Sequence, residues 1–150
     1  MNQAIDRIAP TAVLLAIVVC TLSFAFPNAG DLQQQVNGKN PKKAIEFLRR
    51  SGLSGRMLND YVYGGYLIWA DPDRKVFIDG RADIFDWTGV LQEYKDFVTL
   101  ANAPEVLLDK YRVDFCVLSP AAPVIRVLKY LPRWKEVYSD EISVVYSRSR

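Results

Sequence analysis

The N-terminal apolar segment constrains this chain more than any other feature. Residues 8–30 read IAPTAVLLAIVVCTLSFAFPNAG, contain no charged side chain, and are most strongly apolar over 12–26. About 20 apolar residues in a helix cross the hydrocarbon core of a bilayer, and Pro10 and Pro27 stand where such a helix would begin and end. An all-round apolar helix in a small soluble domain would need burial on every side. The segment therefore predicts a single transmembrane helix over 8–30.

A cleaved signal peptide is the alternative for the same residues. Arg7 supplies a positive charge before the apolar run, and the small residues near Ala25 or Ala29 are suitable cleavage positions. Both interpretations carry the rest of the chain across the membrane. With the membrane anchor, which we favour, we expect a single-pass protein of the inner membrane whose globular domain lies outside the cytoplasm.

The rest of the chain has the pattern of one small α/β domain. Residues 31–40 are polar and contain glycine, which predicts a linker, and 41–147 form the extracytoplasmic domain. The predicted helices are 41–51, 87–100, 104–111 and 123–130, and the aromatic-rich stretch 63–70 is predicted to be a short helix or a turn. The predicted strands are 56–61, 75–78, 113–118, 134–138 and 142–146. Strands that alternate with helices indicate a layered α/β fold with a mixed sheet, and the last two strands indicate a C-terminal β-hairpin.

Composition removes several classes of function. The 150 residues include no histidine, which excludes Ser-His-Asp and Cys-His nucleophile activation and the usual His-containing zinc sites. The net charge is +2 with acids and bases interspersed, so we expect no nucleic-acid partner. Neither the glycine spacing of a dinucleotide fold nor a P-loop is present, and we expect no cofactor. Cys20 lies in the apolar run and Cys116 in a predicted strand, so no disulfide is expected between them.

The turn after the predicted strand 75–78 is the first candidate site. Asp79, Arg81 and Asp83 follow what the pattern predicts to be a central strand, and open α/β sheets bind ligands at the carboxyl ends of such strands. Two neighbouring carboxylates could hold a hard divalent cation. The alternative is that both acids pair with Arg81 and hold the loop in shape. We favour the pairing and assign no metal site.

A glycine pair among aromatic residues is the second candidate site. Gly64 and Gly65 allow close approach of the backbone, either to a ligand or to a neighbouring helix. The surrounding tyrosines and Trp69 could form a shelf on which a sugar stacks, or they could pack the core, which we favour. We assign no catalytic residue. The candidate ligand-binding residues are Tyr63, Gly64, Gly65, Asp79, Arg81 and Asp83.

Four stretches of the sequence carry a resemblance to a known group of proteins. NDYVYGGYLIW, KVFIDGRADIF, LLDKYRVDFCVLS and PRWKEVYSDEISVVY resemble the extracytoplasmic C-terminal region of bacterial GT-C type membrane glycosyltransferases, of the dolichyl-phosphate-mannose protein mannosyltransferase-like kind. The resemblance covers about 41–146 and extends more distantly to the catalytic subunit of oligosaccharyltransferase. There, an aromatic pair followed by Asp-Tyr-Gly helps to hold the acceptor peptide. Tyr63 and Gly64 match this motif, but Val62 stands in place of the acid.

The resemblance implies a binding role without catalysis. Such enzymes bind a lipid-linked sugar donor among many transmembrane helices and use carboxylates on the loops between them, whereas this sequence predicts one span and none of those loops. We therefore expect a membrane-anchored, non-catalytic module that binds or positions a glycan, a peptide or a partner subunit. Its expected partners are the lipid bilayer and, as candidates, a polytopic membrane protein subunit and a glycan or peptide. The alternative is one part of a split membrane glycosyltransferase, in which this domain completes the active site of a polytopic partner.

Overall fold

The computed structural model describes residues 12–21 and 38–149, in two compact units that divide between Gly38 and Lys39. In the first unit, residues 12–21 form a helix whose side chains are all exposed. No helix in the described ranges is long and apolar enough to cross a membrane. The remainder of the predicted transmembrane segment 8–30, and most of the predicted linker 31–40, lies outside the described residues.

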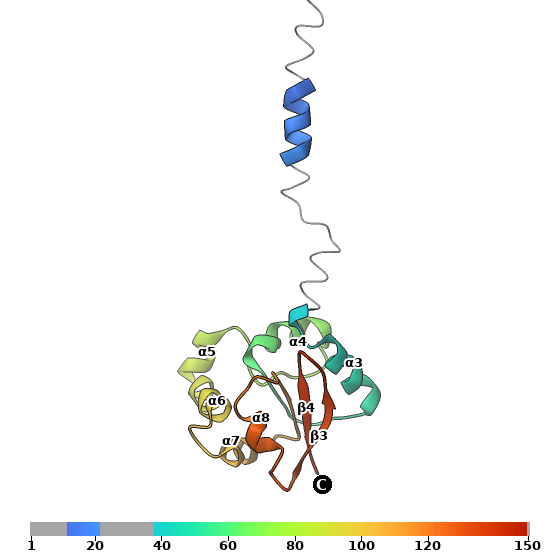
Figure 1. The fold of residues 1–150 in the computed structure, drawn as a ribbon. Helices are drawn as coiled ribbons and strands as arrows, with labels where there is room; N and C mark the ends of the chain where they lie inside the picture. The colour runs from blue at the N-terminus through green and yellow to red at the C-terminus, as the bar shows by residue number, and fades with distance from the viewer. Residues whose placement is uncertain (1–11, 22–37, 150) are drawn as a thin grey trace, which may run out of the picture. The chain divides into compact units, whose positions relative to one another are not determined.

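The second unit is the α/β domain that the sequence predicts (Figure 1). Its described elements are, in chain order, α3 (Lys42–Ser51), β1 (Met57–Asn59), the 3-10 helix η1 (Tyr61–Tyr63), α4 (Gly64–Ala70), α5 (Ala82–Trp87), α6 (Val90–Thr99), α7 (Pro104–Lys110), β2 (Phe115–Leu118), α8 (Ile125–Leu128), β3 (Trp134–Ser139) and β4 (Val144–Arg148). The predicted helix 87–100 corresponds to α6, which begins only at Val90 because Gly89 has a left-handed backbone with φ 77° immediately before it. The separate helix α5 was not predicted.

The four strands form one mixed sheet in the order β1-β2-β4-β3. β1 and β2 are parallel, with Met57 opposite Phe115, and β4 is antiparallel to both β2 and β3. β3 and β4 form the predicted C-terminal hairpin, with a register shift between Glu136 and Tyr138. The mixed sheet and the hairpin are therefore confirmed.

The predicted strand 75–78 is wrong. This segment lies beside β1 but forms no strand ladder, because the side chain of Asn59 bonds to its backbone. The Oδ1 atom of Asn59 accepts a hydrogen bond from Phe77 N at 2.8 Å, and its Nδ2 atom donates to Ile78 O at 2.8 Å. One buried amide thus replaces the backbone of a fifth strand. As a result, Asp79 and Arg81 do not follow a central strand as predicted.

Alternate residues of the strands face two helical layers. Cys116 and Leu118 of β2 belong to a core cluster that includes residues of α6, α7 and α8, while Phe115 and Val117 belong to a cluster that includes residues of α3 and α4. This period of two is what a strand buried on both faces requires. A third cluster joins Ile78 to α6 through Leu91 and Tyr94. The sheet is therefore the middle layer of a three-layer domain (Figure 1).

Candidate functional site

The predicted glycine site is packed into the domain. Tyr63 is buried, its hydroxyl donates a hydrogen bond to Ile142 O, and burial raises the pKa of Tyr63 to about 12. A Cβ on Gly64 would lie 2.2 Å from Ile78 O, so the backbone of α4 approaches segment 78–79 closely only because residue 64 is glycine. A Cβ on Gly65 would meet open space. The two glycines therefore differ, and only Gly64 is required by packing.

The predicted acidic turn is an internal ion pair. Arg81 Nε lies 2.9 Å from Asp79 Oδ1 and Arg81 Nη2 lies 2.6 Å from Asp79 Oδ2, while the Arg81 backbone N–H donates to Oδ1 at 3.0 Å. The hydrogen bonds from Arg81 lower the pKa of the buried Asp79 carboxyl below its ordinary value. Asp83 lies exposed in the first turn of α5, and its charge helps to raise the pKa of Arg81.

These six residues do not form a single pocket of free groups. Tyr63 and Gly64 join α4 to its neighbours, and Asp79 and Arg81 neutralise each other. Within the described ranges, no group of three or more Cys, Asp and Glu side chains is placed to hold a metal ion. The ligand-binding role of the six residues stays a prediction.

Asp60 forms a polar cluster at the carboxyl ends of β1 and β2 that sequence reasoning did not single out. Its Oδ1 atom accepts hydrogen bonds from Tyr94 Oη at 3.2 Å and Val62 N at 3.3 Å, and its Oδ2 atom accepts one from Ser119 N at 3.2 Å. The Tyr94 hydroxyl in turn accepts from Tyr61 N at 2.9 Å, and burial raises the pKa of Tyr94. Because both of its oxygens are hydrogen-bonded within the protein, Asp60 holds η1 and the chain after β2 in place.

A cavity of about 680 Å³ lies at the opposite, amino end of β1. Three separate stretches of the chain line it: residues 53–57, the segment that includes Asp71 and 73–77, and the pair Tyr111 and Val113. Gly55 is fixed in this wall, because it has φ 115° and a Cβ there would lie 2.2 Å from the Asp114 carboxylate. A volume of this size is typical of small-molecule binding sites.

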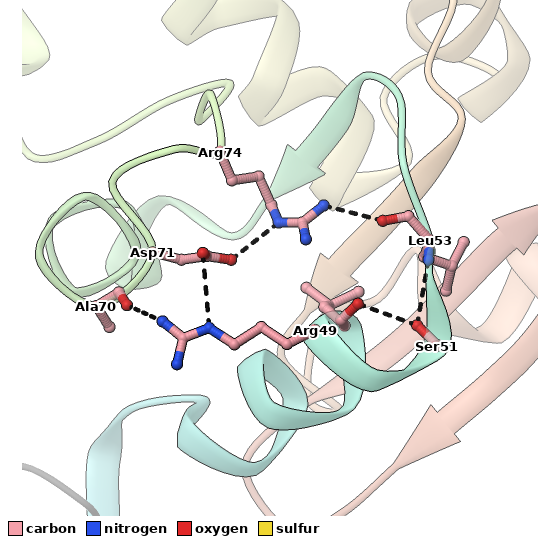
Figure 2. Close-up of polar contacts among 7 residues, drawn as sticks. Arg49, Ser51, Leu53, Ala70, Asp71 and Arg74 are labelled. Carbon is pink, nitrogen blue, oxygen red and sulfur yellow. Dashed lines mark hydrogen bonds and ion pairs between the residues drawn. The ribbon is translucent and has the colours of Figure 1, made fainter.

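An ion-pair network forms one wall of the cavity, and Figure 2 shows its arrangement. The Asp71 carboxylate lies between two guanidinium groups, 3.0 Å from Arg74 Nε and 3.7 Å from Arg49 Nε. Arg74 Nη1 donates to Leu53 O at 3.1 Å, and Arg49 Nη2 donates to Ala70 O. The network thus joins α3, the end of α4 and the loop before β1, and it holds the two main walls of the cavity together.

Other charged groups of the cavity are free to meet a ligand. Lys75 and Asp73 are exposed and make no hydrogen bond or ion pair with any residue in the described part of the chain. Arg56 is also exposed and uses its Nη1 atom to donate to Tyr111 O at 3.3 Å. Lysine and arginine beside apolar walls such as Phe77 can bind a polar or anionic ligand. The arrangement is thus suited to binding.

Sequence reasoning missed this cavity because its walls are distant along the chain. The segment around Asp71 and Asp73 gives only a turn signal, and nothing in the sequence connects Arg49 with Asp71, which are 22 positions apart. The one available signal is the run of charged residues Asp73, Arg74 and Lys75 directly before an apolar stretch.

Comparisons with known proteins find no relative of this chain. No family model, no curated protein and no solved structure matches it. The relation to GT-C glycosyltransferases therefore stays a prediction from the sequence motifs.

Proposed function

We propose that this chain is a membrane-anchored, non-catalytic module whose α/β domain binds or positions a glycan, a peptide or a partner subunit. In this proposal the domain is related to the C-terminal domain of GT-C glycosyltransferases, and its ligand enters the cavity beside Arg74. The observation that best supports the proposal is a cavity of about 680 Å³ that combines apolar walls with unpaired charged side chains.

The apolar helix 12–21 supports the anchoring part of the proposal. Val13, Leu14, Leu15 and Ile17 are each more than half exposed in the described structure, which is costly for a helix surrounded by water. Thr21, the one hydroxyl residue of this helix, donates to Ile17 O at 2.9 Å and is also 2.9 Å from a second carbonyl of the same helix. Bonds within the helix satisfy a hydroxyl in an apolar solvent, as lipid requires.

The buried ionisable groups support a role without catalysis. The Cys116 thiol is buried in the sheet, where burial raises its pKa and keeps it protonated. Tyr63 and Tyr94 are buried and hydrogen-bonded to the protein, and Asp60 is bonded through both oxygens. Nucleophiles and general acids or bases need exposure to a substrate, which these groups lack.

Ligand binding by the full chain in lipid nanodiscs tests the proposal. Oligosaccharides and short peptides would be titrated against the wild type and against Lys75→Ala and Arg56→Ala, with Lys135→Ala on β3 as the matched control. We expect each cavity variant to weaken binding about tenfold, the effect of one charge-assisted hydrogen bond, and the control to bind like the wild type. Equal binding by all four proteins, or no binding by any, would contradict the assignment of the cavity.

Sugar transfer separates this proposal from the split-enzyme alternative. The purified chain would be incubated with a lipid-linked sugar donor and acceptor peptides, alone and with any polytopic membrane protein that copurifies with it. We expect no transfer by the chain alone. Transfer that requires both proteins and is lost in the Arg81→Ala variant would favour the split glycosyltransferase.

A further inference from the structure

The helical segment after β1 exposes an apolar surface. Tyr61 to Ala70 reads YVYGGYLIWA, ten residues without a charge. In the folded domain Val62 is 68 %, Ile68 43 % and Trp69 70 % exposed. We call these three residues, together with Gly65, the α4 surface.

The members of the α4 surface lie on one side of the helical segment. Val62, Gly65 and Trp69 are spaced by three and four positions through η1 and α4, which places them on one helix face, and Ile68 adjoins it. Gly65 has open space above it, so the face is flat between the larger side chains. The opposite face, with Tyr63 and Leu67, is buried. The exposed apolar groups are therefore an outer face of the domain and are not incompletely packed core.

Three unpaired lysines flank the point where the domain begins. Lys39, Lys42 and Lys43 are exposed, and within the described ranges none of them forms an ion pair. The start of α3 is close to α4, because Ala44 and Ile45 share a core cluster with residues of η1 and α4. Figure 1 shows the first residues of the domain and α4 at the same end of it. Basic and apolar exposed groups thus occur at the same end of the domain.

We propose that the α4 surface and these lysines lie against the surface of an anionic lipid bilayer. Tryptophan prefers the boundary between acyl chains and headgroups, and lysines near an anionic membrane gain favourable electrostatic energy. The inference rests on the proposed membrane anchor, which supplies the bilayer.

Helix α5 offers an internal comparison. Its Trp87 is 93 % exposed and Ile84 is 52 % exposed, but the same short helix also exposes Asp83 and Asp86. Anionic lipids repel these carboxylates. A bilayer should therefore contact Trp69 and leave Trp87 in water, although Trp87 is the more exposed of the two.

Tryptophan fluorescence in vesicles tests this inference directly. The chain has three tryptophans, Trp69, Trp87 and Trp134, all within the α/β domain. Two double variants leave a single reporter at the surface: Trp87→Phe with Trp134→Phe keeps Trp69, and Trp69→Phe with Trp134→Phe keeps Trp87. Each full chain would be reconstituted into vesicles of phosphatidylcholine and phosphatidylglycerol whose acyl chains carry bromine, a short-range quencher. Flotation of the vesicles on a density gradient would report anchoring separately.

We expect about threefold stronger quenching of Trp69 than of Trp87, since only Trp69 would reach the acyl chains. Quenching of Trp69 should fall in 1 M salt, where the screening length drops to about 3 Å, and in the triple variant Lys39→Gln, Lys42→Gln, Lys43→Gln. The variant Lys129→Gln, Lys135→Gln is the control and should behave like the wild type.

The outcomes separate this inference from the anchor. If the chain floats with the vesicles and Trp69 is quenched no more than Trp87, the inference is overturned and the anchor stands. If the chain does not float, the proposed anchoring fails and the inference fails with it.

Discussion

The two ends of β1 differ in how they use polar residues. At the carboxyl end, Asn59 and Asp60 are buried, and their side chains bond to the backbone and to Tyr94. At the amino end, the chain around Arg56 borders a cavity whose wall contains exposed charged groups. The sequence places its most conspicuous polar and glycine motifs near the carboxyl end. Dense polar motifs thus serve the fold at one end of β1, while the space for a ligand lies at the other end.

Among substitutions at the two ends of β1, the one at Asn59 should lower the stability of the domain most. Asn59→Ala removes the amide that bonds to the part-buried Phe77 N–H and to the buried Ile78 carbonyl, so both groups lose this partner. We expect a loss of about 3 to 5 kcal/mol in the free energy of unfolding, measured by urea denaturation. Asn102→Ala, which removes an exposed hydrogen bond to Asp96, is the control and should cost less than about 1 kcal/mol. Equal losses of stability in the two variants would show that the hydrogen bonds of the Asn59 side chain do not stabilise the fold.

The glycine pair should divide into one sensitive and one tolerant position. Gly64→Ala forces a Cβ to within 2.2 Å of Ile78 O and should destabilise the domain by about 2 to 3 kcal/mol. Gly65→Ala meets no neighbour and raises helix propensity, so it should stabilise the domain by up to about 1 kcal/mol. Thermal unfolding of both variants measures the difference. A stable Gly64→Ala protein would contradict the close approach of α4 to segment 78–79.

At the amino end of β1, substitutions should distinguish cavity-wall residues that stabilise the fold from those that do not. Arg74→Ala removes the bonds to Asp71 and Leu53 O and should cost about 1 to 2 kcal/mol. Lys75→Ala should change stability by less than about 0.5 kcal/mol, because Lys75 is exposed and unpaired within the described ranges. Urea denaturation of the two neighbouring variants provides the test, and a large cost for Lys75→Ala would show that its side chain has a structural partner.

The Asp79–Arg81 ion pair should have a smaller effect on stability, and this effect should depend on pH. Hydrogen bonds from Arg81 lower the pKa of Asp79 in the folded state below the value near 3.9 of an unfolded chain. The stabilisation is therefore complete above about pH 4 and is lost as the pH falls through the lower, folded-state pKa. Stability curves of the wild type and Asp79→Asn should accordingly converge as the solution becomes more acidic. A gap that stays constant with pH would contradict the ion pair.

Local residue patterns predicted much of the fold. The spacing of apolar residues identified the α3, α6 and α7 helices, and short apolar runs separated by turn residues identified the hairpin of β3 and β4. These features depend on neighbours a few positions apart, which the sequence displays directly. Residues 75–78 were misassigned because a short apolar run looks the same whether its backbone bonds to a strand or to a side chain such as that of Asn59.

The candidate site could not be predicted in the same way. Residue type alone made Tyr63 and Arg81 candidates for ligand binding. Whether the polar group of such a residue is free depends on partners far along the chain, such as Ile142 for Tyr63. The cavity likewise exists only because residues 53–57 and 73–77 come to lie opposite each other with Tyr111 nearby.

By itself, the sequence determined an apolar N-terminal segment, a separate α/β domain and a chemistry without histidine, because these follow from residue type and short-range periodicity. Only the tertiary structure decided which polar groups are hydrogen-bonded within the protein and where a cavity for a ligand remains. The physical reason is that hydrogen bonds and cavities form between residues that are distant along the chain and become neighbours only when it folds. Their separation in the sequence does not reveal which of them will be in contact.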